Sequence, residues 1–108
     1  MPDVWGTLAQ SAPAAATLTN AYTTPSGKRS TVEVIVCNRG AVATTIRMSY
    51  AIAGAADAAA QYMIYDYTIG ANISVSTARF TTKATDVVRV YSASGNVTFT
   101  INGIEEDA

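Results

Sequence analysis

Thr31-Val-Glu-Val-Ile-Val-Cys37 is the stretch that decides the fold, because polar and apolar side chains alternate along it. Its three valines fall on one face of an extended chain, and the residues between them point to the other face. Two further stretches, Thr45–Ile52 and Asn96–Asn102, alternate in the same way. A period of two over β-branched residues is typical of half-buried antiparallel strands.

Turn-forming residues separate the alternating stretches. Four such turns are expected, at Pro25–Lys28, Asn38–Gly40, Gly70–Asn72 and Ser94–Asn96. The last of them predicts a hairpin that joins Asp86–Ser92 to Val97–Ile101. About seven or eight short strands follow from this spacing. The sequence therefore predicts an all-β chain folded as a single antiparallel β-sandwich, jelly-roll-like or immunoglobulin-like.

The ends of the chain are expected to differ from its body. Residues 1–16 have no clear period and contain two prolines, so we expect an extended N-terminal arm with a short strand near Val4–Leu8. Residues 17–104 form the predicted sandwich. Residues 105–108 carry three acidic side chains in a row and are expected to be a solvated acidic end. Within the body, Ala53–Ala60 is expected to be a loop with one helical turn at Asp57–Ala60.

The composition excludes several classes of function. The chain has 108 residues, which is enough for one domain, and only 14% of them are charged. With no histidine, one cysteine and a net charge of −1, it lacks histidine-based catalysis, histidine metal sites, an internal disulfide and a basic nucleic-acid surface. No apolar run approaches the length of a membrane span. We therefore expect no enzyme, cofactor, metal, nucleic-acid partner or membrane partner.

The remaining nucleophiles and carboxylates give no sign of a catalytic arrangement. The lysines Lys28 and Lys83 lie beside predicted turns or strand ends, where solvent reaches them. The carboxylates of the chain body show no pairing of the kind that glycoside hydrolysis needs. Cys37 ends a predicted strand and is expected to act as a small apolar residue, or to form an intermolecular disulfide in an oxidising medium.

Tyrosines mark one strand as a candidate interface. With strict alternation, Tyr65 and Tyr67 share one face with Met63, while Tyr62 and Ile64 occupy the other. Apolar groups on both faces indicate a strand that is covered twice. One cover is the domain core, and the other is a partner subunit, a sugar stacked on the rings, or the loop 53–60.

Trp5, the only tryptophan, is the fourth candidate interface residue. Its indole either packs back over the edge of the sandwich or anchors the arm on a neighbouring subunit. The low charge of the surface favours association in general, because neutral Thr, Ser and Ala groups cost little to desolvate.

The chain also resembles a known group of proteins. Six segments are similar to small β-proteins encoded among the structural genes of tailed bacteriophages: Leu8–Leu18, Tyr22–Gly27, Val36–Gly40, Ala43–Arg47, Gln61–Asp66 and Ala84–Tyr91. The likeness covers roughly residues 7–106 and contains no catalytic signature.

The resemblance implies a non-enzymatic virion protein, assembled in the host bacterial cytoplasm. Such a protein would decorate the capsid or join the neck or tail. Its partners would be copies of itself, as a trimer or higher ring, and a major capsid, neck or tail protein. The alternative function is a carbohydrate-binding module for host attachment that uses surface tyrosines.

Overall fold

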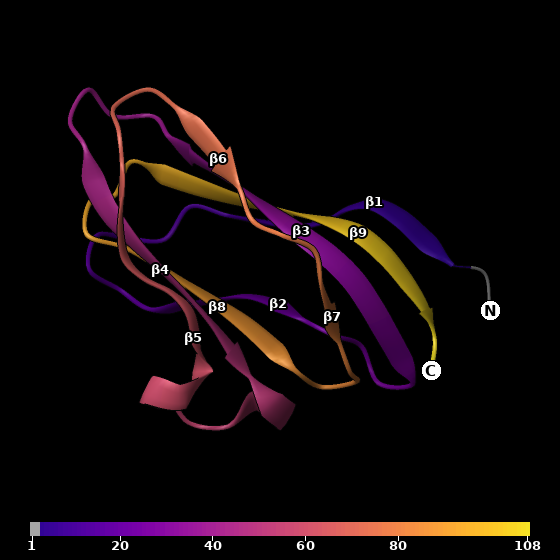
Figure 1. Cartoon of the computed structure of the whole chain (residues 1–108). Coiled ribbons are helices and arrows are strands. Elements are labelled where there is room, and N and C mark those ends of the chain that lie inside the picture. Colours follow the sequence, from indigo (N-terminus) through magenta and orange to yellow (C-terminus); the bar gives the residue numbers. More distant parts are fainter. Residues whose placement is uncertain (1–2) are drawn as a thin grey trace.

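A computed structural model describes residues 3–108, which fold into two antiparallel sheets packed face to face (Figure 1). The first sheet runs β1–β9–β3, and both β6 and β7 pair with the remaining side of β3; the second runs β2–β8–β4–β5. The strands are β1 (Val4–Ser11), β2 (Thr19–Thr23), β3 (Lys28–Asn38), β4 (Thr44–Ala51), β5 (Tyr62–Ile69), β6 (Ser74–Ser76), β7 (Phe80–Thr82), β8 (Val87–Ser92) and β9 (Val97–Asp107). The all-β architecture of two packed sheets is thus confirmed.

The core lies between the sheets and follows the alternation of the sequence. Val32, Val34 and Val36 of β3 are at most 1% exposed, as the period of two predicted. Phe99 and Ile101 of β9 extend this layer. The second sheet supplies the facing layer, with Ile46, Met48, Ile69, Val88 and Val90. Burial of this apolar surface from both sheets is the main force that holds them together.

Most connections cross from one sheet to the other, and this corrects one prediction. The Ser94–Asn96 turn does not close a hairpin: β8 pairs with β2 and β4, whereas β9 pairs with β1 and β3. Turn residues fix a reversal of the chain, but they do not fix which sheet the next strand joins. Only β4 and β5 are both consecutive in sequence and paired with each other among the described strands.

Residues 3–108 contain nine strands, where seven or eight were expected. Part of the difference lies in the stretch between Ile73 and Thr82, where the structure has two short strands, β6 and β7. At the break, the Thr77 side-chain oxygen accepts a hydrogen bond from the Val34 amide at 3.0 Å, in place of a regular ladder bond. This edge of the first sheet is therefore interrupted.

The N-terminal arm is not confirmed. The short strand expected near Val4–Leu8 is present but longer, and β1 is an edge strand of the first sheet. It pairs with β9 from Val4 to Ser11, with one bulge between Thr7 and Ala9. Residues 1–2 of the expected arm lie outside the described residues.

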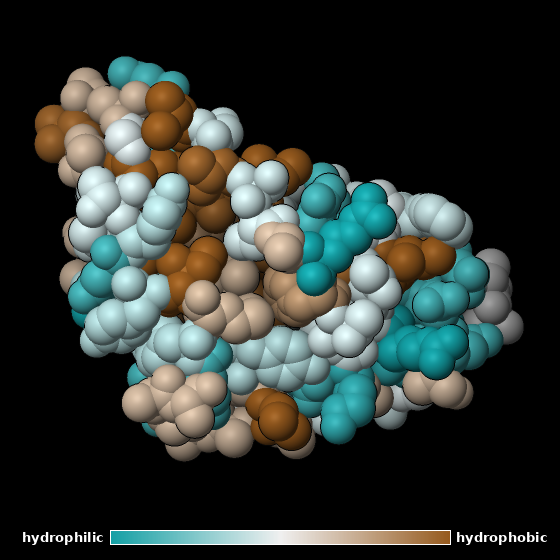
Figure 2. Space-filling model, viewed as in Figure 1, coloured by the Kyte–Doolittle hydropathy of each residue, from teal (hydrophilic) through white to brown (hydrophobic). Residues whose placement is uncertain are grey.

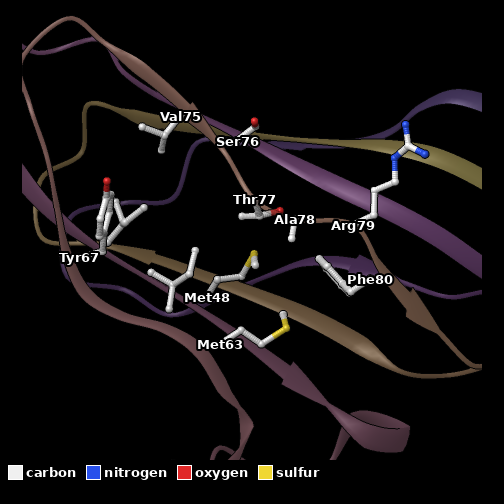
Figure 3. Close-up of a pocket in the computed structure, with 11 residues that line it drawn as sticks. Met48, Met63, Tyr67, Val75, Ser76, Thr77, Ala78, Arg79 and Phe80 are labelled. Carbon is white, nitrogen blue, oxygen red and sulfur yellow. The ribbon is translucent and has the colours of Figure 1, made fainter.

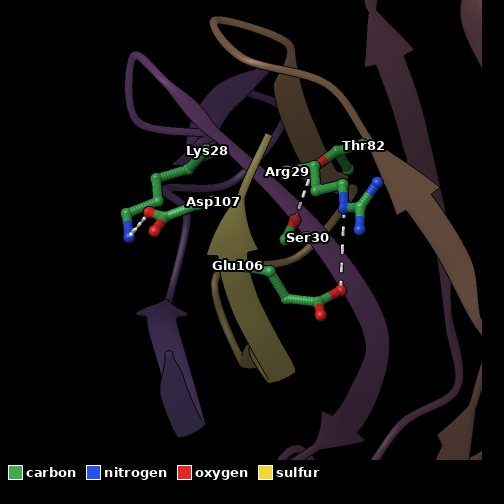
Figure 4. Close-up of polar contacts among 6 residues, drawn as sticks. All are labelled: Lys28, Arg29, Ser30, Thr82, Glu106 and Asp107. Atoms are coloured by element: carbon green, nitrogen blue, oxygen red, sulfur yellow. Dashed lines mark hydrogen bonds and ion pairs between the residues drawn. The ribbon is translucent and has the colours of Figure 1, made fainter. Parts of the chain in front are cut away.

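The acidic C-terminal residues are a continuation of β9 and not a separate solvated segment. Their backbone pairs with the start of β3, so that Lys28 faces Asp107 and Arg29 faces Glu106. Lys28 Nζ donates to Asp107 Oδ1 at 2.7 Å, and the Arg29–Glu106 ion pair measures 3.7 Å (Figure 4). Positive groups on the neighbouring strand therefore balance the acidic run that the sequence presents as isolated.

The Ala-rich segment between β4 and β5 contains two short 3₁₀ turns, Ile52–Gly54 and Ala59–Gln61. The single turn expected at Asp57–Ala60 is close to the second of these. Residues 52–60 are all exposed, so this segment is a surface loop.

Candidate interaction surfaces

The four predicted interface residues do not lie together. Trp5 belongs to β1, at one edge of the first sheet, and the three tyrosines belong to β5, at an edge of the second sheet. Strand β1 contacts β2, which forms the edge of the second sheet opposite β5. The two sets therefore occupy opposite sides of the sandwich (Figure 1). Their role as interface residues stays a prediction.

Two bulges in β5 overturn the predicted assignment of its faces. Met48 of β4 pairs with Ile64, whereas Ile46 pairs with Tyr67 and Ser49 pairs with Tyr62. On both sides of the Met48–Ile64 pair, β5 therefore has one residue more than β4. Each extra residue reverses the alternation of side chains. Tyr62 consequently does not share a face with Ile64, and Tyr65 does not share one with Tyr67.

The outer face of the second sheet carries a cluster of aromatic rings around one arginine, which we call the arginine cluster. The Tyr62 and Tyr65 rings meet edge to face, with centroids 5.1 Å apart. The Arg47 guanidinium lies 4.3 Å from the ring centroid of Tyr65 and 4.6 Å from that of Tyr91. Each of these contacts places the positive guanidinium over the electron-rich face of a ring, which is an attractive arrangement.

Asp66 completes the arginine cluster. Its two carboxylate oxygens accept hydrogen bonds from Arg47 at 2.6 and 3.3 Å. Asp66 has a positive φ of 51°, a conformation that aspartate tolerates better than most residues. The same residue therefore supplies a backbone kink and holds the guanidinium against the rings.

A shallow hollow of about 620 Å³ adjoins this cluster, between β5 and the Ala-rich loop. It is lined by Arg47, Tyr62 and Tyr65, together with residues 57–59. The Tyr62 hydroxyl donates to Asp57 at 3.2 Å, and burial together with this bond raises the pKa of the phenol. The loop 53–60, one of the three covers considered for this strand, thus contacts it through Asp57.

A second opening, which we call the inter-sheet groove, runs between the edge of β5 and the segment β6–β7. Its volume is about 350 Å³. Figure 3 shows the side chains that line it. Met63, Ile64 and Tyr67 line one side, and residues 75–80 line the other. The floor is formed by Ile46 and Met48, which belong to the core. Apolar surface is visible between the two sheets on this side of the molecule (Figure 2).

The sequence did not predict the groove or the arginine cluster; of the three predicted interface tyrosines, Tyr65 and Tyr67 are exposed and Tyr62 is partly buried. Val75 and Phe80 reach the groove from another sheet, and no local pattern connects them to β5. Arg47 is one of five arginines that are spread along the sequence without clustering. The usable signal was its position on the outward face of an alternating stretch, where a ring on a neighbouring strand could meet it.

The most buried carboxylate has a structural role. Asp86 is 2% exposed and accepts hydrogen bonds from the backbone amides of Ala53 and Lys83, each at 2.9 Å, and from the Tyr50 hydroxyl. These bonds tie the end of β4 to the turn before β8. Within residues 3–108, no group of three or more Cys, Asp or Glu side chains could hold a metal ion. The same residues contain no helix with the length and apolarity needed to cross a membrane.

Comparisons with models of known protein families and with curated proteins find no match to this chain. Its function is therefore inferred from the surfaces that its own side chains form.

Proposed function

We propose that the chain is a non-enzymatic structural protein of a bacteriophage particle. In this role it would bind copies of itself and a larger capsid, neck or tail protein. The inter-sheet groove is the observation that carries the proposal. The resemblance of six sequence segments to phage structural proteins supports the setting.

The groove supports association because it leaves core-type side chains in contact with water. Met63 is 43% exposed and Tyr67 is 51% exposed, next to fully buried Ile46. Exposed apolar surface that is contiguous, and not scattered, is characteristic of protein contacts. Methionine side chains also adapt to partners of different shape. Covering this opening would extend the core instead of creating a separate interface.

The rest of the surface favours the same role. Charged residues make up 14% of the chain, compared with about 25% in an average soluble domain. Interfaces are depleted in charged groups at their centres, because each such group must be desolvated or paired. Residues that are already paired in strands lose little further conformational freedom on binding, which lowers the entropic cost of assembly.

A pair of lysine substitutions on the same strand tests the proposal. Met63→Lys places a charge in the groove, whereas Thr68→Lys places one at an exposed position outside the groove residues. We expect the unmodified chain to form oligomers, or to co-sediment with heads or tails of the phage whose genome encodes it. Met63→Lys should lose this association, and Thr68→Lys should keep it. Light scattering after size exclusion measures the mass, and sedimentation measures binding to particles.

The proposal fails if the unmodified chain is monomeric and binds neither heads nor tails. If both lysine variants associate equally well, the inter-sheet groove is not the surface through which the chain associates.

A further inference from the structure

Trp5 borders a small hollow on the first sheet, separate from the inter-sheet groove except for Arg79, which lines both. The residue is 76% exposed, so its indole is almost entirely in water. Trp5 pairs with Ile104 of β9, and on its other side Ile104 pairs with Thr31 of β3. The hollow crosses these three strands and has a volume of about 200 Å³.

Planar polar side chains line the same hollow. Besides Trp5, its lining residues include Glu33, Arg79 and Asn102, whose side chains end in a carboxylate, a guanidinium and an amide. The Asn102 oxygen accepts a hydrogen bond from Thr7 at 2.8 Å, which fixes the amide and leaves its NH₂ group to donate elsewhere. The side chains of Glu33 and Arg79 make no hydrogen bond or ion pair with any of residues 3–108. Donors and acceptors without partners thus surround a bare aromatic ring.

We propose that this hollow binds a single neutral hexopyranose ring, the terminal or internal unit of a glycan. The C–H groups on one face of such a sugar carry partial positive charge and suit the negative face of an indole. Its hydroxyls donate to a carboxylate and accept from a guanidinium or an amide. Because Glu33 and Arg79 carry opposite charges, the hollow has no net charge and selects against ionised sugars. Its volume is below the ~300 Å³ of a drug-sized pocket, which matches one ring.

The tyrosines of β5 fit a sugar less well than Trp5 does. The guanidinium of Arg47 covers a face of the Tyr65 ring, and the edge-to-face contact occupies Tyr62. A sugar would have to displace these contacts before it could stack. Trp5 has no ring or cation contact with other described residues, so stacking there displaces only water. This site does not depend on the proposed role in assembly.

The experiment uses the full chain, whose only tryptophan reports directly on the site. The chain is applied to an array of neutral, acidic and amino oligosaccharides. The methyl glycoside of the terminal sugar of the strongest binder is then titrated while tryptophan fluorescence is recorded. We expect a neutral glycan to bind and to shift the emission of Trp5 saturably.

Variants distinguish this site from the others. Trp5→Ala and Glu33→Gln should each weaken array binding by roughly tenfold or more, while Tyr65→Ala, the matched aromatic control, should leave it unchanged. Circular dichroism checks that each variant is folded. The proposal is overturned if no glycan binds, if only acidic glycans bind, or if Trp5→Ala binds like the unmodified chain. It is also overturned if the emission shifts with protein concentration in the absence of sugar, because a second copy would then cover the indole.

Discussion

Asp86 illustrates how one residue fixes local structure. Its burial alone would raise the pKa of the carboxyl group, but hydrogen bonds from Tyr50, Ala53 and Lys83 favour the ionised form, and the net effect is a lowered pKa. The folded state therefore binds the proton less tightly than the unfolded chain does. Stability from this residue is present above the unfolded pKa of 3.8 and is lost as the pH falls through the lower folded value.

Asp86→Asn tests this account. At pH 7 we expect the variant to unfold more easily by about 1–3 kcal/mol, because three donors lose a charged acceptor. The deficit should shrink as the pH falls below the unfolded pKa of 3.8, because the unfolded wild-type chain then takes up a proton at this carboxyl group more readily than the folded chain does. Urea unfolding at pH 7 and at pH 3 measures both values. Asp57→Asn is the control, because that residue is exposed. A deficit at pH 7 equal to that of the control would contradict the account.

At the scale of single elements, regular strands could be predicted and irregular ones could not. In β3 every second residue from Val32 to Val36 is buried, as the alternation requires. In β5 the same rule failed, because two bulges each insert a residue. A bulge depends on how the neighbouring strand aligns, and this alignment is not visible in the sequence of β5 alone. The predicted grouping of its tyrosines on two faces was therefore wrong, while their role as interface residues stays a prediction.

Strand β9 depends on a residue without a side chain. Gly103 lies between Gly6 of β1 and Val32 of β3. A Cβ atom at this position would lie 1.9 Å from the carbonyl oxygen of Thr31, which is far inside any real contact distance. The obstacle is backbone, so it cannot rotate away. The close approach of the two strands at this point therefore requires glycine.

We expect Gly103→Ala to destabilise the fold by about 1–3 kcal/mol or more, the range for inserted atoms that force the backbone to shift. For a domain of this size each 1 kcal/mol lowers the melting temperature by roughly 4–8 °C. Gly95→Ala is the matched control, because its Cβ would lie 3.8 Å from the nearest atom. Calorimetry of both variants measures the difference. Equal melting temperatures would show that β9 and β3 are less tightly joined than the geometry indicates.

For the whole molecule, the sequence predicted the class of fold but not the path of the chain. Alternating stretches were sufficient for two sheets around an apolar core. Which strands share a sheet depends on contacts across long separations, such as β1 with β9, and turn residues do not encode them. The candidate surfaces show the same difference between what a local pattern predicts and what depends on distant contacts. Surface aromatics could be selected one by one, but the groove exists only where β5 meets β6–β7 across two sheets.

Two tyrosines join parts of the molecule that are distant in sequence. The Tyr22 hydroxyl, on β2 of the second sheet, donates to Glu105 on β9 of the first at 2.6 Å. The Tyr50 ring, on β4, contacts Phe80 on β7, with centroids 6.1 Å apart. Burial, reinforced by a carboxylate partner in each case, raises the pKa of both phenols from 10.0 to about 12.

These raised pKa values predict how the whole fold responds to alkali. Between pH 10 and about 12 the unfolded chain loses the two phenolic protons while the folded chain keeps them. Stability contributed by the neutral phenols is therefore complete below pH 10 and is lost as the pH rises through 12. Tyr22→Phe should make the decline in stability over this range less steep, because one of the two titrating groups is gone. Urea midpoints at a series of pH values, followed by far-ultraviolet circular dichroism, measure these slopes. A slope that Tyr22→Phe does not alter would mean that the inter-sheet hydrogen bond to Glu105 contributes nothing to the alkaline limit of the fold.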